Sequence, residues 1–294
     1  MKPAIAVVDV HGTYKVHTEF YASPTARKTI ILVNGSLATT AAFAQTVKYL
    51  HPQFNVVLYD QPYAGQSKPH NSNARPISKE DEAHILLDLI EHFRVDYLQS
   101  FSWGGVAAML ALSQRPARIE KAVITSFSPL LNEAMLDYLE KGLNYLHAAD
   151  GSNLGHLVNN TIGKHLPSLF KRFNHRHISS LDEHEYRQMF AHVNQVVHME
   201  SHCQMECLAG IRIPVLFVNG EHDEYTPPKD VRVLTDHLSA CQFATIDNAG
   251  HFLDMEHKAA WLQSRDVLLG FLQGSPQRER IYRPLPELQH AMAV

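Results

Sequence analysis

Three residues of the types that cooperate in nucleophilic catalysis lie far apart in this chain, at Ser102, Asp223 and His251. A serine hydroxyl is a poor nucleophile until a neighbouring base removes its proton, and a carboxylate is needed to orient that base. Each of the three residues follows a short apolar stretch that is typical of a buried β-strand. Their types, order and placement predict a catalytic triad in which Ser102 attacks, His251 acts as general base and Asp223 orients His251.

The segment around Ser102 has the composition of a tight strand-to-helix turn. Such a turn requires small residues two positions to either side of the serine, because bulky side chains would clash across it. Gly104 and Ser100 meet this requirement, although Ser100 stands where the commonest pattern has glycine. We therefore interpret Ser100 as a small residue that the turn needs and not as a second nucleophile.

Acyl transfer also needs two backbone N–H groups that hold the developing negative charge, which is the oxyanion hole. Trp103 directly follows the nucleophile and is expected to supply one of them. The loop after the first central strand reads Asn34-Gly35-Ser36-Leu37, and Ser36 is expected to supply the other. Backbone donors place few demands on the side chains, so Asn34 is acceptable where histidine is more usual.

Other residues compete for the roles of acid and base. Glu221 and Glu224 lie in the same loop as Asp223, and the chain has 20 histidines, so one histidine near the C-terminus means little by itself. His251 is distinguished by the glycine before it and by its place in a loop after the last strand. His257 is the main alternative, but it falls inside the helix expected to follow.

Short apolar strands alternate with helices of about ten residues, which predicts an α/β fold with a mostly parallel central sheet and helices on both faces. The sequence opens with a predicted hairpin around His11-Gly12. Further strands are expected at residues 29–33, 55–59, 95–101, 121–129, 213–218 and 241–246, and helices at residues 41–50, 82–93, from 104, and 259–272. Residues 130–207 are helical in pattern, so we expect a core of residues 1–129 and 208–275, a helical cap insertion at 130–207 and a C-terminal tail at 276–294.

The composition indicates a globular protein without nucleic-acid partners. Its net charge is −4, and 45% of its 294 residues are hydrophobic. Three cysteines suit reduced intracellular thiols better than disulfides. The N-terminus does not resemble a signal peptide, and no apolar run reaches the roughly 18–20 residues that a membrane-spanning helix needs. The cytoplasm is therefore the expected location.

One cluster could in principle bind a metal. His198, His202, Cys203 and Cys207 are spaced so that a helix could group some of them. A tetrahedral site takes ligands from more than one element, however, and cysteines on helices are usually small core residues. We expect no metal and no cofactor.

The triad residues, together with a loop of the form Asp60-x4-Gly65-x-Ser67, resemble those of the α/β-hydrolase superfamily over residues 28–272. In that fold the triad follows the order Ser, Asp, His, and among the acids of its loop Asp223 is the one that matches the family pattern. The resemblance implies an α/β-hydrolase fold with residues 130–207 as its cap. A narrower resemblance rests on the segments NGSLATTAAFAQT, FNVVLYDQPYAGQS, SWGGVAAMLALSQRP, LNEAMLDYLEKG, NGEHDEYT and GHFLDMEHK.

These segments resemble the 3-(3-hydroxyalkanoyloxy)alkanoate synthases of rhamnolipid biosynthesis, a family whose historical name is that of a rhamnosyltransferase subunit. The resemblance implies an acyltransferase that joins two 3-hydroxyacyl thioesters through an ester bond to make the lipid precursor. It implies 3-hydroxyacyl-coenzyme A or 3-hydroxyacyl-acyl carrier protein as substrate. A rhamnosyltransferase partner and peripheral contact with the inner membrane are further expectations.

Part of the predicted cap is basic: residues 151–181 contain lysines and arginines but no carboxylate. Lys171, Arg172 and Arg176, with Lys164 nearby, could attract the phosphates of coenzyme A or the acidic surface of an acyl carrier protein. The alternative is an ordinary solvated face of amphipathic helices. For the whole protein, the alternatives are a carboxylesterase or acyl thioesterase with the same triad, and a non-catalytic binding protein of this fold.

Overall fold

An eight-stranded sheet forms the centre of the molecule, in the order β1-β2-β4-β3-β5-β6-β7-β8. This computed structural model describes residues 2–72, 75–198 and 208–274. The first two strands pair as an antiparallel hairpin, β2 runs antiparallel to β4, and all further neighbours are parallel. The strands are β1 (Ala4–Val10), β2 (Tyr14–Tyr21), β3 (Thr29–Val33), β4 (Asn55–Tyr59), β5 (Tyr97–Phe101), β6 (Lys121–Thr125), β7 (Val215–Gly220) and β8 (Cys241–Ile246).

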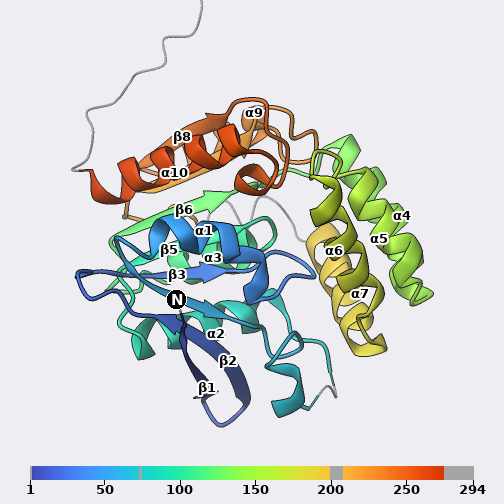
Figure 1. Ribbon diagram of the computed structural model, residues 1–294, viewed down its shortest axis with the longest axis horizontal. Helices are drawn as coiled ribbons and strands as arrows, with labels where there is room; N and C mark the ends of the chain where they lie inside the picture. Colours follow the sequence, from blue (N-terminus) through green and yellow to red (C-terminus); the bar gives the residue numbers. More distant parts are fainter. Residues whose placement is uncertain (1, 73–74, 199–207, 275–294) are drawn as a thin grey trace, which may run out of the picture.

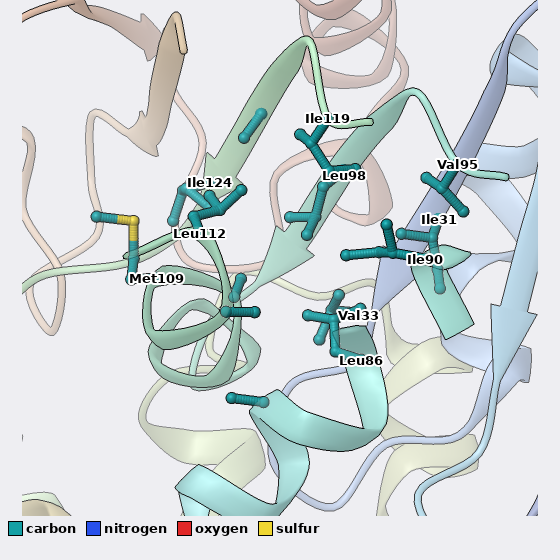
Figure 2. Packing of buried hydrophobic residues seen from close by; sticks show 14 of the residues in the cluster. Ile31, Val33, Leu86, Ile90, Val95, Leu98, Met109, Leu112, Ile119 and Ile124 are labelled. Atoms are coloured by element: carbon teal, nitrogen blue, oxygen red, sulfur yellow. The ribbon is translucent and has the colours of Figure 1, made fainter. Parts of the chain in front are cut away.

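Helices cover both faces of the sheet, as the alternating pattern predicted, and Figure 1 shows this arrangement. Side chains of α2, α3 and the α9–η3 segment pack on one face, and those of α1 and α10 pack on the other. Figure 2 shows the first of these cores, where Ile90 of α2 lies beside Ile31 of the sheet and Leu86 of α2 lies beside Val33. The core helices are η1 (Thr40–Phe43), α1 (Ala44–Leu50), η2 (Lys68–His70), α2 (Lys79–His92), α3 (Gly104–Ser113), α9 (Pro228–Val231), η3 (Arg232–Asp236), η4 (Leu253–Met255) and α10 (Lys258–Gln273).

Strands β3 and β4 show why the protein folds this way, because β3 is buried at every position and β4 at all but its first. A strand with both sides buried requires covering layers on each face of the sheet. The helix predicted at residues 41–50 differs in detail: it begins as the 3₁₀ turn η1 and becomes α-helical only at Ala44.

Within the described residues, the helices α4 to α7 form the segment predicted as the cap, and they gather together to one side of the sheet (Figure 1). These cap helices are α4 (Glu133–His147), α5 (Gly151–Asn160), α6 (Ser168–Ser179) and α7 (Glu183–His198). They share an apolar cluster that includes Leu139, Leu154 and Val193 and also contains Trp103 of the core. Residues 199–207 of the predicted cap and the predicted tail, 276–294, lie outside the described residues.

A buried polar cluster connects the cap to the core. His192 of α7 lies 2.7 Å from the Ile77 carbonyl through Nε2, and 3.7 Å from Glu82 of α2. Glu82 pairs with Lys79 at 2.8 Å and accepts a 2.6 Å hydrogen bond from Tyr63. Burial lowers the pKa of His192 to about 4, so this histidine is neutral at physiological pH. The cluster fixes α7 against the core without a buried positive charge on its histidine.

Candidate active site

The turn between β5 and α3 holds Ser102 in a left-handed backbone conformation, with φ = 50°. This conformation is uncommon and strained for a residue other than glycine. The Ser102 N–H donates to the Thr125 carbonyl at 2.9 Å, which ties the turn to the end of β6. Gly104 is required beside it, because a Cβ there would lie 2.3 Å from the Asn34 carbonyl oxygen. The turn thus presents Ser102 where α3 and the end of β3 approach each other closely.

The structure brings the three predicted triad residues within hydrogen-bonding distance. His251 Nε2 lies 3.0 Å from Ser102 Oγ, and His251 Nδ1 lies 2.8 Å from Asp223 Oδ2. His251 and Asp223 are each 2% exposed, so water does not compete for this contact. The three side chains come from the ends of β5, β7 and β8, which meet at one edge of the sheet.

Asp223 is held by more than His251. The backbone N–H groups of Tyr225 and Thr226 each donate to Oδ1 at 3.0 Å, and the Thr226 hydroxyl donates to Oδ2 at 2.5 Å. Burial alone would raise the pKa of this carboxyl. The neighbouring His251 and the hydrogen bonds outweigh that effect, so the pKa of Asp223 lies below its ordinary value. Asp223 is therefore a carboxylate throughout the neutral range.

Two residues that the sequence did not single out hold the loop of His251. Glu256 is buried and accepts hydrogen bonds from the N–H groups on both sides of His251, from Gly250 at 2.7 Å and Phe252 at 3.0 Å. Ser126, at the end of β6, donates from its hydroxyl to the His251 carbonyl at 2.6 Å. No signal in the sequence indicated Ser126, because the strand expected at residues 121–129 ran past it, and its contact with a residue 125 positions away was not predictable.

The competing acids and base have other partners. Glu221 accepts from the Asn248 N–H at 2.8 Å, and Glu224 pairs with Lys164 at 2.8 Å. His257, which was expected inside the following helix, instead directly precedes α10 and caps it by accepting from the Ala260 N–H. Ser100 is fully buried in β5, as a small residue behind the turn would be. Among these candidates, the structure places His251 beside Ser102 and Asp223 beside His251.

The predicted oxyanion loop lies directly against Ser102. A Cβ on Gly35 would come within 3.2 Å of the Ser102 Cβ, so glycine permits this close approach. Ser36 and Trp103 both line the cavity that contains Ser102 and His251. Within the described part of the protein, neither of their backbone N–H groups donates to a protein acceptor. Both groups are thus free to bind an oxyanion at this end of the cavity.

A cap residue that was not predicted contacts this loop. His177 of α6 lies with Nε2 2.7 Å from the carbonyl oxygen of Leu37, the residue after Ser36. Leu37 has φ = 58°, another strained left-handed conformation, so a donor on its carbonyl helps to hold the loop. The position of the cap is thereby connected to the geometry of the oxyanion loop.

We expect the His177→Phe variant to acylate Ser102 three- to tenfold more slowly, because a single hydrogen bond contributes about 0.5–1.5 kcal/mol. The His177→Gln variant retains an N–H donor and should recover part of the rate. Stopped-flow measurement of the burst with an activated ester checks the prediction. Equal bursts in all three proteins would show that the contact does not position the loop.

An apolar cavity extends from Ser102 beneath the cap helices. Trp103 lines it, together with side chains of α4, α5 and α7. Its other apolar lining residues are Leu37, Met135, Leu139, Leu146, Leu154, Ile162, Met189 and Val193. A second, wider space also borders Ser102 and Trp103, and Phe127 and Leu131 help to line it. The two spaces therefore meet at Ser102, and the apolar lining of the first suits an alkyl group.

The three predicted carrier-binding residues all lie on α6, but they differ in availability. Arg172 and Arg176 are exposed. Lys171 is half-buried, and its ammonium group donates to the Lys164 carbonyl at 2.8 Å. Lys171 is therefore partly committed within the cap, and the two arginines form the accessible basic pair.

The candidate metal cluster falls largely outside the described residues. His202, Cys203 and Cys207 lie there, and His198 contacts the Asn194 carbonyl at 2.7 Å. Over residues 2–72, 75–198 and 208–274, no three side chains of metal-binding type gather together. No helix in these same ranges has both the length and the apolar character needed to cross a bilayer.

Comparison with known proteins places the sequence in context. A model of the alpha/beta hydrolase fold family matches residues 28–258. An (R)-3-hydroxydecanoyl-ACP:CoA transacylase of Pseudomonas aeruginosa is 61% identical over 290 residues, which cover 97% of this chain, with 96% of that protein covered in turn. A protein of the same name from Pseudomonas putida is 58% identical over 295 residues, with 100% of both chains covered.

Solved structures agree on the architecture. A hydrolase of Pseudomonas aeruginosa has a TM-score of 0.74 at 17% identity, and the match covers 92% of this chain and 98% of the hydrolase chain. A carboxylesterase of Bacillus subtilis has a TM-score of 0.73 at 19% identity, with coverage of 94% and 93%. At these identities the likeness shows the fold alone. Together with the family match, it confirms the predicted fold class.

Proposed function

Since this chain belongs to the alpha/beta hydrolase fold family, we propose that it is an acyltransferase that carries 3-hydroxyacyl groups on Ser102. The observation that supports this most directly is the position of His251, between Ser102 Oγ and the Asp223 carboxylate, at the end of an apolar cavity. The named relatives act as transacylases of a 3-hydroxydecanoyl group, in keeping with an acyl-carrying serine.

The first half of the reaction transfers the acyl group to the protein. His251 donates its Nδ1–H to Asp223, so Nε2 is free to accept the Ser102 proton as Oγ attacks the thioester carbonyl carbon. The N–H groups of Ser36 and Trp103 stabilise the oxyanion. The C–S bond then breaks, His251 protonates the departing thiolate, and the acyl group remains on Ser102 as an ester.

The second half depends on the acceptor. We propose the 3-hydroxyl group of a second 3-hydroxyacyl unit: His251 removes its proton, the oxygen attacks the acyl-enzyme, and Ser102 is released. The product is a 3-(3-hydroxyalkanoyloxy)alkanoate, and release of the second carrier consumes one water. The names of the relatives favour another acceptor as well, the thiol of coenzyme A, which would give a new thioester by the same steps. Neither route needs a cofactor.

Water must be kept from the acyl-enzyme, because hydrolysis would turn the transferase into a thioesterase. The cap helices line the cavity with leucine, isoleucine, valine and methionine side chains, which exclude water while they bury the alkyl group. Acceptor choice thus depends on the cap, whereas the triad alone would serve a carboxylesterase equally well.

We infer that the carrier, coenzyme A or acyl carrier protein, docks beside α6 through Arg172 and Arg176, with Lys171 supporting the helix. The double variant Arg172→Glu/Arg176→Glu should raise KM for carrier-bound substrates about tenfold and leave small esters unaffected, with a smaller difference at high salt. Lys141→Glu is the matched control, because Lys141 is an exposed cap lysine that pairs with Asp137. Unchanged kinetics of the double variant would show that these arginines do not bind the carrier and only form a solvated helix face.

We also propose that the enzyme works in the cytoplasm, where acyl carriers are available, and that peripheral contact with the inner membrane would place it near a rhamnosyltransferase. Mixing the purified protein with such a partner, or with anionic vesicles, and sedimenting the mixture tests both ideas.

Mass spectrometry of the products from 3-hydroxydecanoyl thioesters, with and without free coenzyme A, decides the acceptor. An ester-linked dimer supports the hydroxyl acceptor, and 3-hydroxydecanoyl-coenzyme A formed from the carrier-protein thioester supports the thiol. Monomeric acid alone would show a thioesterase. Failure of a fluorophosphonate probe to label Ser102 in the folded protein would instead indicate a non-catalytic binding protein.

A further inference from the structure

One face of α4 lines the apolar cavity. Met135, Tyr138, Leu139, Gly142 and Leu146 line it, at spacings that bring residues to one side of a helix. Met135 also lines the wider space that reaches Ser102, whereas Gly142 and Leu146 line only the apolar cavity. Gly142 lies seven residues, or roughly 10 Å along the helix axis, beyond Met135. It therefore borders the part of the cavity away from the wider space.

Gly142 is an unusual residue for its place. It lies in the interior of a 15-residue helix and is buried, and glycine there is less favourable than alanine. Its φ is not positive, so the backbone does not require glycine. The nearest atom that an added Cβ would meet is Leu157 Cδ2 at 3.9 Å, an ordinary van der Waals contact.

Other buried glycines of the cap differ from Gly142 in this respect. A Cβ on Gly151 would lie 1.9 Å from the Tyr186 hydroxyl, and one on Gly155 would lie 2.9 Å from the His175 ring. Those glycines are needed because helices or side chains pack against them. At Gly142 neither packing nor backbone geometry calls for glycine, yet the missing side chain enlarges the cavity.

We propose that Gly142 determines acyl-chain length: the space it leaves holds the distal methylenes of the acyl group attached to Ser102. This inference rests on the proposed function, because it assigns the apolar cavity to the acyl group. A larger side chain at position 142 shortens the cavity from its far end and leaves Ser102, His251 and the oxyanion loop unchanged. Short acyl chains then fit as before, and long chains no longer bury their ends.

The test uses Gly142→Ala and Gly142→Leu with a series of 3-hydroxyacyl-coenzyme A substrates of increasing chain length. For Gly142→Leu, kcat/KM should fall roughly fourfold for each methylene that can no longer be buried, so that the longest chains lose tenfold or more. The shortest chains should react at the wild-type rate, and Gly142→Ala should show a smaller shift in the same direction. Gly270→Ala is the matched control, because Gly270 is a helical glycine of α10 with no atom within 4 Å of an added Cβ.

A second measurement separates this proposal from the proposed function. Alkyl fluorophosphonates of increasing chain length label Ser102 without a carrier or an acceptor, and their labelling rates should show the same length shift in the Gly142 variants. If thioesters prove inert while this shift appears, the cavity assignment holds and the transferase function fails. If Gly142→Leu folds with a wild-type Tm and treats every chain length as the wild type does, the proposal is overturned; should Gly142→Leu not fold, Gly142→Ala decides by the same criterion.

Discussion

Replacing Ser102 with alanine is expected to lower kcat for acyl transfer by roughly 10⁶-fold, the loss typical of a triad without its nucleophile. His251 and Asp223 have no function in covalent catalysis without the oxygen that attacks the thioester. The measurement is single-turnover formation of the acyl-enzyme, followed by intact-protein mass spectrometry. A fluorophosphonate probe should label the wild type and fail to label the variant.

The same position allows a control for folding. Ser102 has φ = 50°, so Ser102→Gly should relieve backbone strain, whereas Ser102→Ala retains it. The free energy of unfolding of Ser102→Gly should therefore equal the wild-type value or exceed it by up to about 1 kcal/mol. Urea unfolding of both variants measures this difference. An inactive Ser102→Gly protein of normal stability would assign the loss to chemistry, and a Ser102→Ala protein that still forms an acyl-enzyme would contradict the assignment of the nucleophile.

Much of the site could be predicted because short sequence patterns indicate its residues. Ser102, Asp223 and His251 each follow an apolar strand, and the small residues around Ser102 indicate the turn. The glycines at 35 and 104 were visible in the sequence, but their purpose became clear only from the close approach between the oxyanion loop and α3. Local sequence thus indicated which residues come together at the candidate site.

The supporting contacts could not be predicted, because they join segments far apart in the sequence. Ser126 meets the His251 carbonyl across 125 positions, and His177 meets Leu37 across 140. Glu256 is nearer to His251 in the sequence, but its hydrogen bonds to the N–H groups of Gly250 and Phe252 depend on how the loop bends in the folded protein. Lys171 illustrates the converse: composition assigned it to a basic face that either docks a carrier or is simply solvated, whereas the fold places its ammonium group on a cap carbonyl.

The second large effect is expected for Asp223→Asn, which should lower kcat at neutral pH by about 10⁴-fold. An asparagine can turn its amide NH₂ toward His251 Nδ1, and the imidazole then carries its proton on Nε2. In that tautomer His251 cannot accept the Ser102 proton. Glu224→Gln is the matched control, since it removes a carboxylate from the same loop that pairs with Lys164 and does not contact His251.

The pH dependence of stability provides an independent check on Asp223. Its folded-state pKa lies below the ordinary value, so it contributes stability that is fully present above the unfolded-state pKa of about 3.9 and is lost as pH falls through the lower, folded-state pKa. Between these values the folded protein keeps a carboxylate that the unfolded state has already protonated. Asp223→Asn should therefore flatten the acid limb of a plot of unfolding free energy against pH, whereas Glu224→Gln should not. An unchanged acid limb, together with kcat within tenfold of the wild type, would mean that Asp223 does not orient His251.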